Sequence, residues 1–389
     1  MKNILTLNTI SPVINDIFDA NYNVSADAVN PDGIILRSFK MHDYIPAENT
    51  VAVARAGAGT NNIPVEEYAE KGIVVFNTPG ANANAVKELV IASLMLGSRK
   101  ISDAIDWVKS LKGKGEEVGK LVEKGKSNFG GNEILGKKLG VIGLGAIGAL
   151  VANSADKLGM KVIGYDPFLS VEAALKLSTH VTVVKNLDEL ISQCDYITLH
   201  IPYIPSQNKN FINAEMIAKM KDSAVIINCA RGELVDNSAV IEAVNTNKLS
   251  RYVCDFPADE IIGVPNIVCI PHLGASTEEA EDNCAVMASK QLIDYLENGN
   301  IVNSVNYPTC VMVNTTKYRL VVLHKNISNI LAQITTAIGS EGVNIANLSN
   351  KSRGDYAVTL IDSESEVSAK AISHLESVDG IIKVRSINF

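Results

Sequence analysis

Short apolar runs, each ended by polar residues or glycine, recur through the N-terminal part of the chain. Gly33–Leu36, Val51–Ala54 and Ile73–Phe76 are continuous runs of this kind. Such runs are typical of strands buried on both faces of a parallel sheet. The segment Val65–Gly72 has a helical pattern that ends at a glycine, as many helices do. The pattern therefore predicts an α/β unit at the start of the chain.

The same alternation is regular between Lys138 and Cys269. The strand candidates there are Leu139–Ile142, Lys161–Tyr165, Tyr196–His200, Ala224–Asn228, Tyr252–Cys254 and Ile267–Ile270. Strands that alternate with helices in this way predict a doubly wound parallel sheet. A long helix is predicted next, from Thr277 to Leu296, because hydroxyl residues precede it and glutamates fill its first turn.

Residues 84–112 carry another long helical pattern, and the stretch Lys109–Lys126 that overlaps its end is rich in lysine, glutamate and glycine. Charges of both signs alternate along this stretch. It is therefore predicted to be a solvated helix and loop rather than a binding arm.

The tail of the chain, after Tyr307 and Pro308, has its own pattern. The predicted elements are, in order, strand Tyr318–His324, helix Asn329–Ser340, strands Val343–Ser349 and Tyr356–Asp362, helix Val367–Glu376 and strand Ile381–Ser386. This β-α-β-β-α-β order is the ferredoxin-like arrangement. A separate small C-terminal domain is expected.

Composition and charge exclude several classes of partner. The net charge of −8 is unfavourable for binding nucleic acid, which needs a basic surface. No run approaches the ~20 apolar residues of a membrane span, and residues 1–8 lack the apolar stretch of a signal peptide. The six cysteines show neither a CxxC pair nor zinc-type spacing, so no metal is expected. They are interpreted as buried reduced thiols in a cytoplasmic protein.

A glycine-rich segment follows the first strand of the central region. Gly143, Gly145 and Gly148 form the G-x-G-x-x-G pattern, and a helix is predicted directly after it. In a dinucleotide-binding (Rossmann) unit the first glycine permits a tight turn, the second lets backbone approach the pyrophosphate, and the third lets the helix pack on the strand. The phosphates would face the free amides of Ala146 and Ile147 at the positive end of the helix.

Asp166 identifies the nucleotide. It ends the next strand, close to the ~20-residue spacing expected for an acid that binds the ribose. A carboxylate there accepts hydrogen bonds from the ribose hydroxyls and repels a 2′-phosphate. Pro167 and Phe168 follow, so no arginine stands ready for that phosphate. NAD is expected rather than NADP.

Polar residues then follow three later strands, at the edge where ligands of an open α/β sheet gather. They are Arg231, the acidic segment Asp255–Glu260, and His272. Hydride transfer from a secondary alcohol requires a base, and histidine has a suitable pKa near neutral pH. A carboxylate would orient the imidazole, and an arginine would bind a substrate carboxylate through paired hydrogen bonds. This set predicts oxidation of a 2-hydroxy acid.

At this point the chain resembles the D-isomer-specific 2-hydroxyacid dehydrogenases. The matching segments are residues 53–63, 76–80, 143–148, 165–167, 199–202, 229–232 and 271–277. The resemblance implies a doubly wound nucleotide domain, residues 96–278, inserted in a flavodoxin-like substrate domain made of residues 1–95 and 279–306. The ferredoxin-like domain is placed at residues 316–389.

The resemblance also implies the site residues. Arg231, an acid and His272 would carry the chemistry. Besides the three glycines, the residues implied to line the NAD site are Thr78, Ala146, Ile147, Asp166, His200, Ile201, Pro202, Cys229, Ala230, Arg231, Asp255, His272, Gly274 and Ala275.

The identity of the acid is left between two residues. Relatives usually carry the acid five residues beyond the aspartate of this segment, with one more residue before the phenylalanine than this chain has. Counting from Asp255 selects Glu260, whereas aligning Phe256 selects Asp259. Glu260 is favoured because its longer side chain reaches an imidazole more easily.

The substrate side is expected at Arg55, just past a strand and flanked by the small residues Ala56 and Gly57, with Asn77 as a residue that can assist. Arg55 is the candidate for binding a phosphate, and Arg231 and His272 for the carboxylate and hydroxyl. The resemblance then implies NAD-dependent oxidation of 3-phospho-D-glycerate to 3-phosphohydroxypyruvate, the entry to L-serine synthesis, in a homodimer or homotetramer. One alternative is a hydroxypyruvate, glycerate or D-lactate dehydrogenase of the same family. A more remote one is a non-catalytic, NAD-sensing corepressor-like protein.

The C-terminal domain resembles the ACT domain, a small-molecule sensor. The resemblance implies that L-serine binds at His324, Asn326 and Asn344, whose spacing matches that of serine-regulated relatives. The turn departs from their Asn-x-Pro-Gly, because Asn329 replaces the glycine. A dimerisation module without a ligand is the alternative.

Overall fold

The computed structural model describes residues 1–389, which divide into two compact units. One unit comprises Met1–Asn82 and Glu281–Phe389, and the other comprises Ala83–Ala280. This division falls before helix α2 (Ala83–Ser98), whereas the prediction placed the boundary at residue 95. Two features of α2 explain the difference. Its buried face joins the core of the second unit, and Gly97 comes so close to β10 that a Cβ would lie 2.7 Å from Val225 Cγ1.

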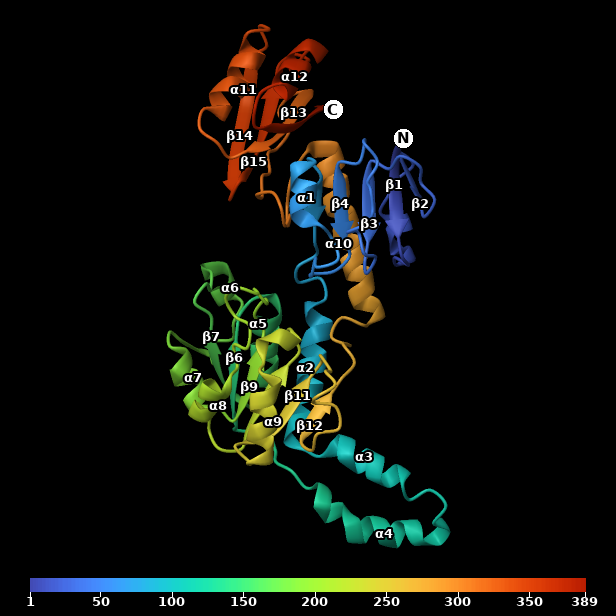
Figure 1. Ribbon diagram of the computed structural model, residues 1–389, viewed down its shortest axis with the longest axis vertical. Helices are drawn as coiled ribbons and strands as arrows, with labels where there is room; N and C mark the ends of the chain where they lie inside the picture. The colour runs from blue at the N-terminus through green and yellow to red at the C-terminus, as the bar shows by residue number, and fades with distance from the viewer. The chain divides into compact units, whose positions relative to one another are not determined.

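A five-stranded parallel sheet begins the first unit (Figure 1). Its strands are β1 (Lys2–Leu7), β2 (Tyr22–Ser25), β3 (Gly33–Leu36), β4 (Ala52–Arg55) and β5 (Val74–Phe76). The order β2-β1-β3-β4-β5 is the predicted flavodoxin-like one. Helix α1 (Val65–Glu70), the short helix η1 (Pro12–Asp16) and helix α10 (Glu278–Asn298) accompany the sheet. Apolar residues of α10, including Leu292 and Tyr295, pack into its core.

The second unit contains the predicted doubly wound sheet, with seven parallel strands. They are β6 (Lys138–Ile142), β7 (Lys161–Tyr165), β8 (Thr182–Val184), β9 (Tyr196–Leu199), β10 (Ala224–Asn228), β11 (Leu249–Cys254) and β12 (Ile267–Cys269). The strand β8 was not predicted, because it is short and two of its three residues are exposed. The order β8-β7-β6-β9-β10-β11-β12 reverses between β6 and β9. Ligands of such sheets bind beyond the carboxyl ends of the strands at this point.

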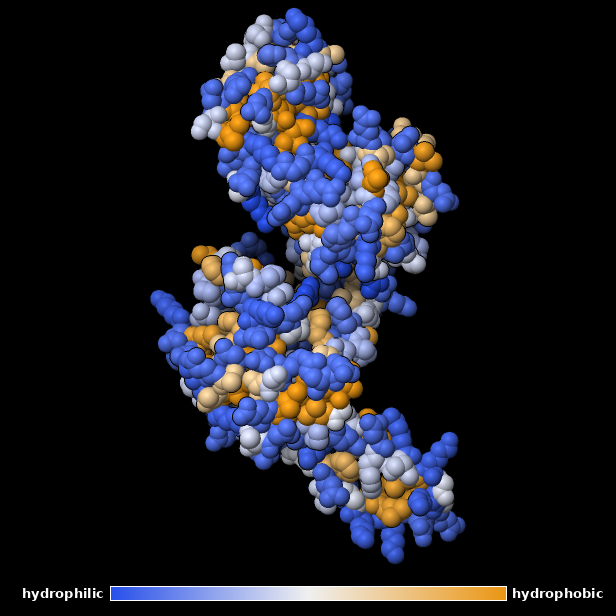
Figure 2. All heavy atoms as spheres, viewed as in Figure 1, coloured by the Kyte–Doolittle hydropathy of each residue, from blue (hydrophilic) through white to orange (hydrophobic).

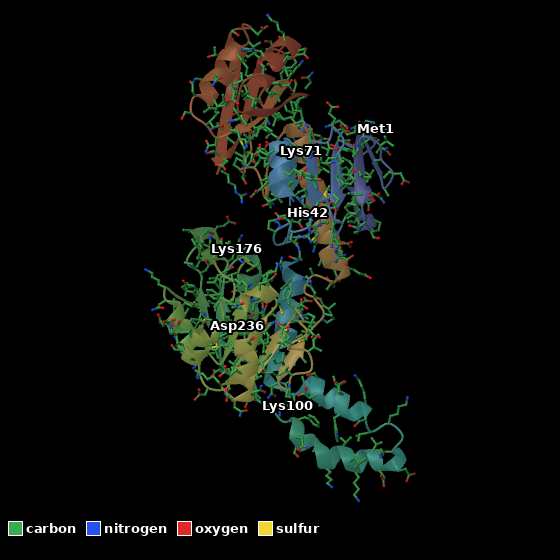
Figure 3. The ribbon with its side chains drawn as sticks, viewed as in Figure 1. Met1, His42, Lys71, Lys100, Lys176 and Asp236 are labelled. Carbon is green, nitrogen blue, oxygen red and sulfur yellow. The ribbon has the colours of Figure 1, made fainter.

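Helices cover both faces of this sheet (Figure 1). Besides α2 they are α5 (Ala146–Lys157), α6 (Val171–Leu175), α7 (Leu187–Gln193), α8 (Ala214–Lys219) and α9 (Asn237–Asn245), and η4 (Gly232–Leu234) follows β10. Several begin at side-chain caps. Asp236, labelled in Figure 3, accepts from the amides of Ser238 and Ala239 at the start of α9. No helix of the structure has both the length and the apolar character needed to cross a membrane.

A helical arm extends from the second unit after Lys100, which is labelled in Figure 3. It consists of α3 (Ile101–Lys109), η2 (Gly115–Glu117), α4 (Val118–Gly125) and η3 (Lys126–Phe129). Neither α3 nor α4 has a buried residue, and Ile105 and Val108 are about half exposed. The long helix predicted over residues 84–112 is divided between α2 and α3, and α4 lies in the stretch predicted as a solvated helix and loop. Figure 2 shows that apolar side chains gather on this arm.

The C-terminal domain has the predicted ferredoxin-like order. Its elements are β13 (Tyr318–Lys325), α11 (Ile330–Gly339), β14 (Ile345–Arg353), β15 (Tyr356–Ser363), α12 (Ala369–Glu376) and β16 (Ile381–Asn388). The antiparallel sheet packs one face on α11 and α12, and its other face joins the core beneath α10. The fully buried pair of Arg319 and Asp362 fixes the start of β13, with Nε to Oδ1 at 2.6 Å.

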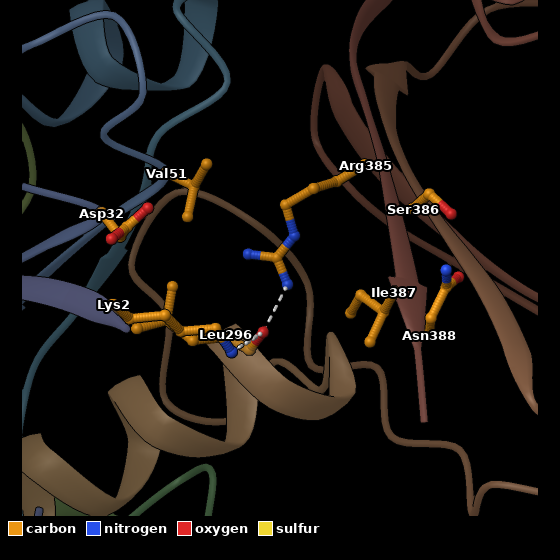
Figure 4. A pocket seen from close by; sticks show the side chains of 8 residues that line it. All are labelled: Lys2, Asp32, Val51, Leu296, Arg385, Ser386, Ile387 and Asn388. Carbon is orange, nitrogen blue, oxygen red and sulfur yellow. Dashed lines mark hydrogen bonds between the residues drawn. The ribbon is translucent and has the colours of Figure 1, made fainter. Parts of the chain in front are cut away.

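The end of α10 meets this domain at a small cavity, shown in Figure 4. Lys2 Nζ donates to the carbonyl of Leu296 at 3.0 Å, and Arg385 of β16 donates to the carbonyls of Tyr295 and Leu296. The Arg385 guanidinium also lies 4.4 Å from the centre of the Tyr295 ring. Because the last carbonyls of a helix lack intrahelical donors and carry partial negative charge, these two cations stabilise the end of α10.

Candidate active site

The three predicted glycines each have a distinct place in the turn from β6 to α5. Gly143 has a φ of +91°, and a Cβ on it would lie 2.5 Å from the carbonyl oxygen of His200. A Cβ on Gly148 would lie 1.9 Å from the carbonyl oxygen of Gly143. No other part of the chain lies within 4 Å of the Cβ position of Gly145, so this backbone faces open space. The free amides of the first turn, at Ala146 and Ile147, follow directly.

Asp166 lies beside this turn. Its Oδ2 accepts from the amide of Leu144 at 2.9 Å, and its Oδ1 accepts from the amide of Phe168 at 2.9 Å. The carboxylate is therefore fixed at the end of β7, next to the glycine turn. A fixed negative charge at this point favours ribose hydroxyls and disfavours a 2′-phosphate.

The segment His200–Pro202, at the end of β9, forms the other side of the glycine turn. The amide of His200 donates to the carbonyl of Ile142 at 2.7 Å, and its Nε2 lies 3.0 Å from Thr198 Oγ1. Burial lowers the pKa of His200 to about 3, so this imidazole is neutral at physiological pH. Ile201 Cγ2 would lie 2.9 Å from a Cβ on Gly143. This histidine shapes the turn as a neutral residue.

Arg231 is held by a residue that sequence analysis missed. The fully buried Asn228, at the end of β10, accepts from the amides of Ala230 and Arg231 at 3.1 and 3.3 Å and donates to the carbonyl of Arg231 at 2.8 Å. It also donates to the hydroxyl of Tyr252 at 3.3 Å. These bonds fix the backbone from Cys229 to Arg231. The exposed Arg231 side chain donates to the carbonyl of Ala230 at 2.7 Å.

Asp255 and His272 belong to neighbouring loops that are hydrogen-bonded to each other. The buried carboxylate of Asp255 accepts from the amides of Leu273 and Gly274 at 2.7 and 2.8 Å. His272 has a φ of +56°, which is rare for a residue with a side chain and is often found at functional sites. Its exposed ring lies 4.7 Å from the ring of Phe256. Asp255 therefore positions the backbone that carries His272.

The acid candidates are both exposed. Glu260 Oε1 accepts from the side-chain Nδ2 of Asn237 at 2.8 Å, and this hydrogen bond lowers the pKa of Glu260. The residue that contacts the His272 ring is Phe256, from the same loop, and not either carboxylate. The structure thus brings the acid-bearing loop to His272, while Glu260 is hydrogen-bonded to Asn237.

The predicted substrate residues of the first unit lie at the carboxyl ends of β4 and β5. Arg55 Nε donates to the carbonyl of Arg37 at 3.1 Å, and a Cβ on Gly57 would lie 2.3 Å from Arg55 Nη1. Asn77 donates to the carbonyl of Ala58 at 2.6 Å. Thr78 is fully buried, its amide donates to the carbonyl of Gly57 at 3.1 Å, and its hydroxyl has no hydrogen-bond partner. These contacts join Arg55, Gly57 and Asn77 in one loop cluster, next to Ala56.

The predicted effector residues differ in accessibility. Both ring nitrogens of the buried His324 are in hydrogen bonds, Nδ1 with the carbonyl of Lys325 at 2.8 Å and Nε2 with Thr359 at 2.9 Å. Asn326 and Asn344 are exposed, and Asn326 donates to the carbonyl of Gly354 at 3.0 Å. Asn329 takes φ of +67°, the left-handed conformation that a glycine adopts easily.

The second unit fits a dinucleotide. Open space at Gly145, two positions where a Cβ would clash, and a fixed carboxylate at Asp166 match a pyrophosphate at the end of α5 and a ribose at the end of β7. Fold and site together define a dinucleotide-binding protein with a Rossmann domain.

Comparison with known proteins gives the family. Residues 91–274 match the family model described as "D-isomer specific 2-hydroxyacid dehydrogenase, NAD binding domain". D-3-phosphoglycerate dehydrogenase of Escherichia coli is 32% identical over 367 residues, which cover 91% of this chain and 85% of that protein. The chain belongs to the D-isomer-specific 2-hydroxyacid dehydrogenase family, and its cofactor is NAD.

Two further relatives mark the extent of the likeness. D-3-phosphoglycerate dehydrogenase of Synechocystis is 41% identical over 286 residues, 71% of this chain and 49% of that protein. The chain thus spans about half the length of this relative. The NAD-bound 3-phosphoglycerate dehydrogenase of Entamoeba histolytica has a TM-score of 0.61 and 29% identity, covering 78% of this chain and 98% of that one.

Proposed function

We propose that this protein catalyses the NAD-dependent oxidation of 3-phospho-D-glycerate to 3-phosphohydroxypyruvate, the first step of L-serine synthesis. The observation that carries the proposal is the placement of Arg231 and His272 after β10 and β12, in the sheet whose β6 ends in the dinucleotide turn. The names of the relatives at 32–41% identity support the substrate.

NAD supplies the hydride acceptor when it is bound. The Arg231 guanidinium binds the substrate carboxylate through paired hydrogen bonds and polarises the C2 oxygen. The C2 hydroxyl proton moves to an imidazole nitrogen of His272, which Asp255 holds through the adjacent amides. The C2 hydroxyl loses its proton as the C2 oxygen becomes a carbonyl oxygen, so the reaction needs a proton acceptor as well as the arginine that binds the carboxylate.

The acid that stabilises protonated His272 is proposed to be Glu260, with Asp259 as the alternative. Support for Glu260 is its longer side chain and its position on the loop of Phe256, which touches the imidazole. Comparison of Glu260→Gln with Asp259→Asn separates them. The variant that lowers kcat, with little change in the Kd for NAD, has lost the acid.

Arg55 is proposed to bind the phosphate of the substrate. It lies at the end of β4, beside the small residues Ala56 and Gly57, and its guanidinium suits a phosphate. In Arg55→Ala, kcat/KM for 3-phospho-D-glycerate should fall by roughly 100-fold, which corresponds to about 2.7 kcal/mol, while kcat/KM for D-glycerate stays within a few fold. The exposed Lys71→Ala is the matched control, because it removes a cation from the same unit. Equal losses on both substrates would argue against a phosphate site here and favour a glycerate or lactate dehydrogenase.

A homodimer or homotetramer is part of the proposal. The helical arm of α3 and α4 supports it, because Ile105 and Val108 expose apolar surface there. Light scattering after size exclusion should give the mass of two or four chains of 41.6 kDa each, and Ile105→Glu should lower the measured mass toward that of one chain. The free state of all six cysteines fits a reducing cytoplasm.

L-serine is the proposed effector of the C-terminal domain. The exposed Asn326 and Asn344 can reach a ligand directly, whereas the buried His324 keeps the adjacent loop in place through its two hydrogen bonds. Serine should lower the initial rate, and Asn344→Ala should weaken that inhibition without changing the uninhibited rate. Full activity at millimolar serine would instead favour a dimerisation module without a ligand.

A further inference from the structure

Two cysteines face each other across β11 and β12, immediately before the loops of Asp255 and His272. Cys254 and Cys269 are directly paired in the parallel register, and their sulfur atoms are 3.8 Å apart. Adjacent strands lie ~4.8 Å apart, within the range of Cα separations that disulfides span. The sulfurs would have to approach by roughly 1.8 Å to reach the ~2.05 Å of an S–S bond, which side-chain rotation and a small shift of one strand can supply.

The two thiols are unequal. Cys254 is fully buried and donates a hydrogen bond to Cys269, and that bond together with burial raises the pKa of Cys254. Cys269 is partly exposed, and accepting this hydrogen bond lowers the pKa of its thiol. Thiolate character and access govern which cysteine an oxidant attacks. Cys269 is thus the sulfur that an oxidant reaches, and Cys254 is the thiol that lies next to it.

We propose that Cys254 and Cys269 are a site of oxidative modification, at which a hydroperoxide such as hydrogen peroxide produces a reversible disulfide. In the first step the Cys269 thiolate attacks the peroxide, giving a sulfenic acid at Cys269 and releasing hydroxide. In the second the Cys254 thiol attacks that sulfur, the S–S bond forms, and water leaves with the Cys254 proton. Overall, two thiols and one hydrogen peroxide yield one disulfide and two waters.

The pair is connected to the catalytic loop by short hydrogen bonds. The amide of Ile270 donates to the carbonyl of Cys254 at 2.8 Å, and the amide of His272 donates to the carbonyl of Ile270 at 3.0 Å. Asp255, which follows Cys254, accepts from the amides beyond His272. Drawing the sulfurs together displaces the backbone on both routes to His272, the one through Ile270 and the one through Asp255. Because His272 is already held at a positive φ, such a displacement moves the imidazole, and activity falls while the disulfide persists.

The chemical part of this proposal is independent of the proposed function, whereas the loss of activity rests on it. The test treats the full chain with hydrogen peroxide at molar ratios of a few to one, and then maps the peptides without reduction. A peptide pair linked through Cys254 and Cys269, about 2 Da lighter than the two free peptides together, is the expected product. Dithiothreitol should restore the free thiols.

Activity is followed in the same samples. The wild-type chain should lose at least 10-fold in kcat and regain it with dithiothreitol, and Cys269→Ser should keep its activity under peroxide. Cys194→Ser is the matched control, because this buried thiol of the same unit lies outside the pair and should leave the response unchanged. The proposal is overturned if Cys254 and Cys269 of the wild-type chain remain unlinked after peroxide treatment, and this result does not depend on whether the variants fold. Linkage with unchanged activity would retain the modification site and refute its effect on catalysis. Absence of turnover before any oxidation would instead refute the proposed function.

Discussion

Asn228 offers a quantitative test of how the site is positioned, because its buried side chain is hydrogen-bonded to the loop of Arg231. Asn228→Ala removes the acceptor of two amides and the donor to one carbonyl in the loop Cys229–Arg231. A buried polar group left without a partner costs about 1–3 kcal/mol. Since Arg231 is exposed, water replaces part of these bonds, so we expect about 2–3 kcal/mol in total.

If that free energy is lost from the arrangement that binds the transition state, kcat/KM should fall by roughly 30- to 150-fold. The assay is NADH formation from 3-phospho-D-glycerate, corrected for the folded fraction by circular dichroism. The Kd for NAD, measured by fluorescence, should change less than kcat/KM, because most residues expected to line the NAD site, including the glycine turn and Asp166, have no hydrogen bond to Asn228. This split distinguishes positioning of Arg231 from general destabilisation.

Tyr252→Phe is the matched control, because it removes the other buried partner of Asn228 and leaves the loop bonds intact. Its kcat/KM should remain within about 3-fold of wild type. The reasoning is refuted if Asn228→Ala retains wild-type kcat/KM, or if Tyr252→Phe loses as much activity.

Three further predictions address the nucleotide site. Gly148→Ala should reduce NAD affinity by at least 10-fold in a fluorescence titration, because its Cβ would meet the Gly143 carbonyl at 1.9 Å, and unchanged affinity would contradict this packing. Asp166→Ala should lower the preference of kcat/KM for NAD over NADP, since the charge held by the Leu144 amide disappears; an unaltered ratio would show that the carboxylate does not select the nucleotide. Burial lowers the pKa of His200 to about 3, whereas an unfolded histidine titrates near 6.5, so the proton favours the unfolded chain between these values. The free energy of unfolding should therefore decrease as pH falls below about 6.5, by up to ~1.4 kcal/mol per pH unit from this group, and denaturant titrations of His200→Gln should lack that part of the slope.

Hydrophobic pattern and glycine spacing predicted the doubly wound sheet, the ferredoxin-like domain and three of the five strands of the first sheet, β3, β4 and β5. The strands β6, β7 and β10 were predicted within one residue of their bounds, because apolar runs ended by glycine or polar residues show where a strand begins and ends. The strands β1, β2 and β8 were missed. Polar residues interrupt β1 and β2, and two of the three residues of β8 are exposed, so none of them has the continuous apolar run on which the prediction depends.

The helical arm and the domain boundary were harder to predict. Alternating charges in Lys109–Lys126 predicted a solvated helix and loop, and α4, which has no buried residue, lies in this stretch. Residues 84–112 were predicted as one helical pattern, whereas the structure ends α2 at Ser98 and begins α3 at Ile101. The position of α2 in the second unit depends on Gly97, whose close approach to Val225 is a tertiary contact that no local pattern reveals.

At the site, residues recognised by type were found more easily than residues that position them. Arg231, Asp166 and His272 stand out because their charges follow apolar strands. Asn228 ends a strand too, yet an amide is common in turns, and its role appears only in the four hydrogen bonds around it. The pairing of Cys254 with Cys269 depends on strand order, since fourteen residues separate them in the chain and sheet neighbours cannot be read from spacing alone.

The central claim is tested most directly by the ratio of kcat/KM for 3-phospho-D-glycerate to that for D-glycerate and D-lactate, with NAD as oxidant and the keto product identified by mass. The account predicts that the phosphorylated acid is preferred by roughly 100-fold or more and yields 3-phosphohydroxypyruvate, and that His272→Ala abolishes this turnover. Preference for an unphosphorylated acid, or equal product formation by His272→Ala, would contradict it.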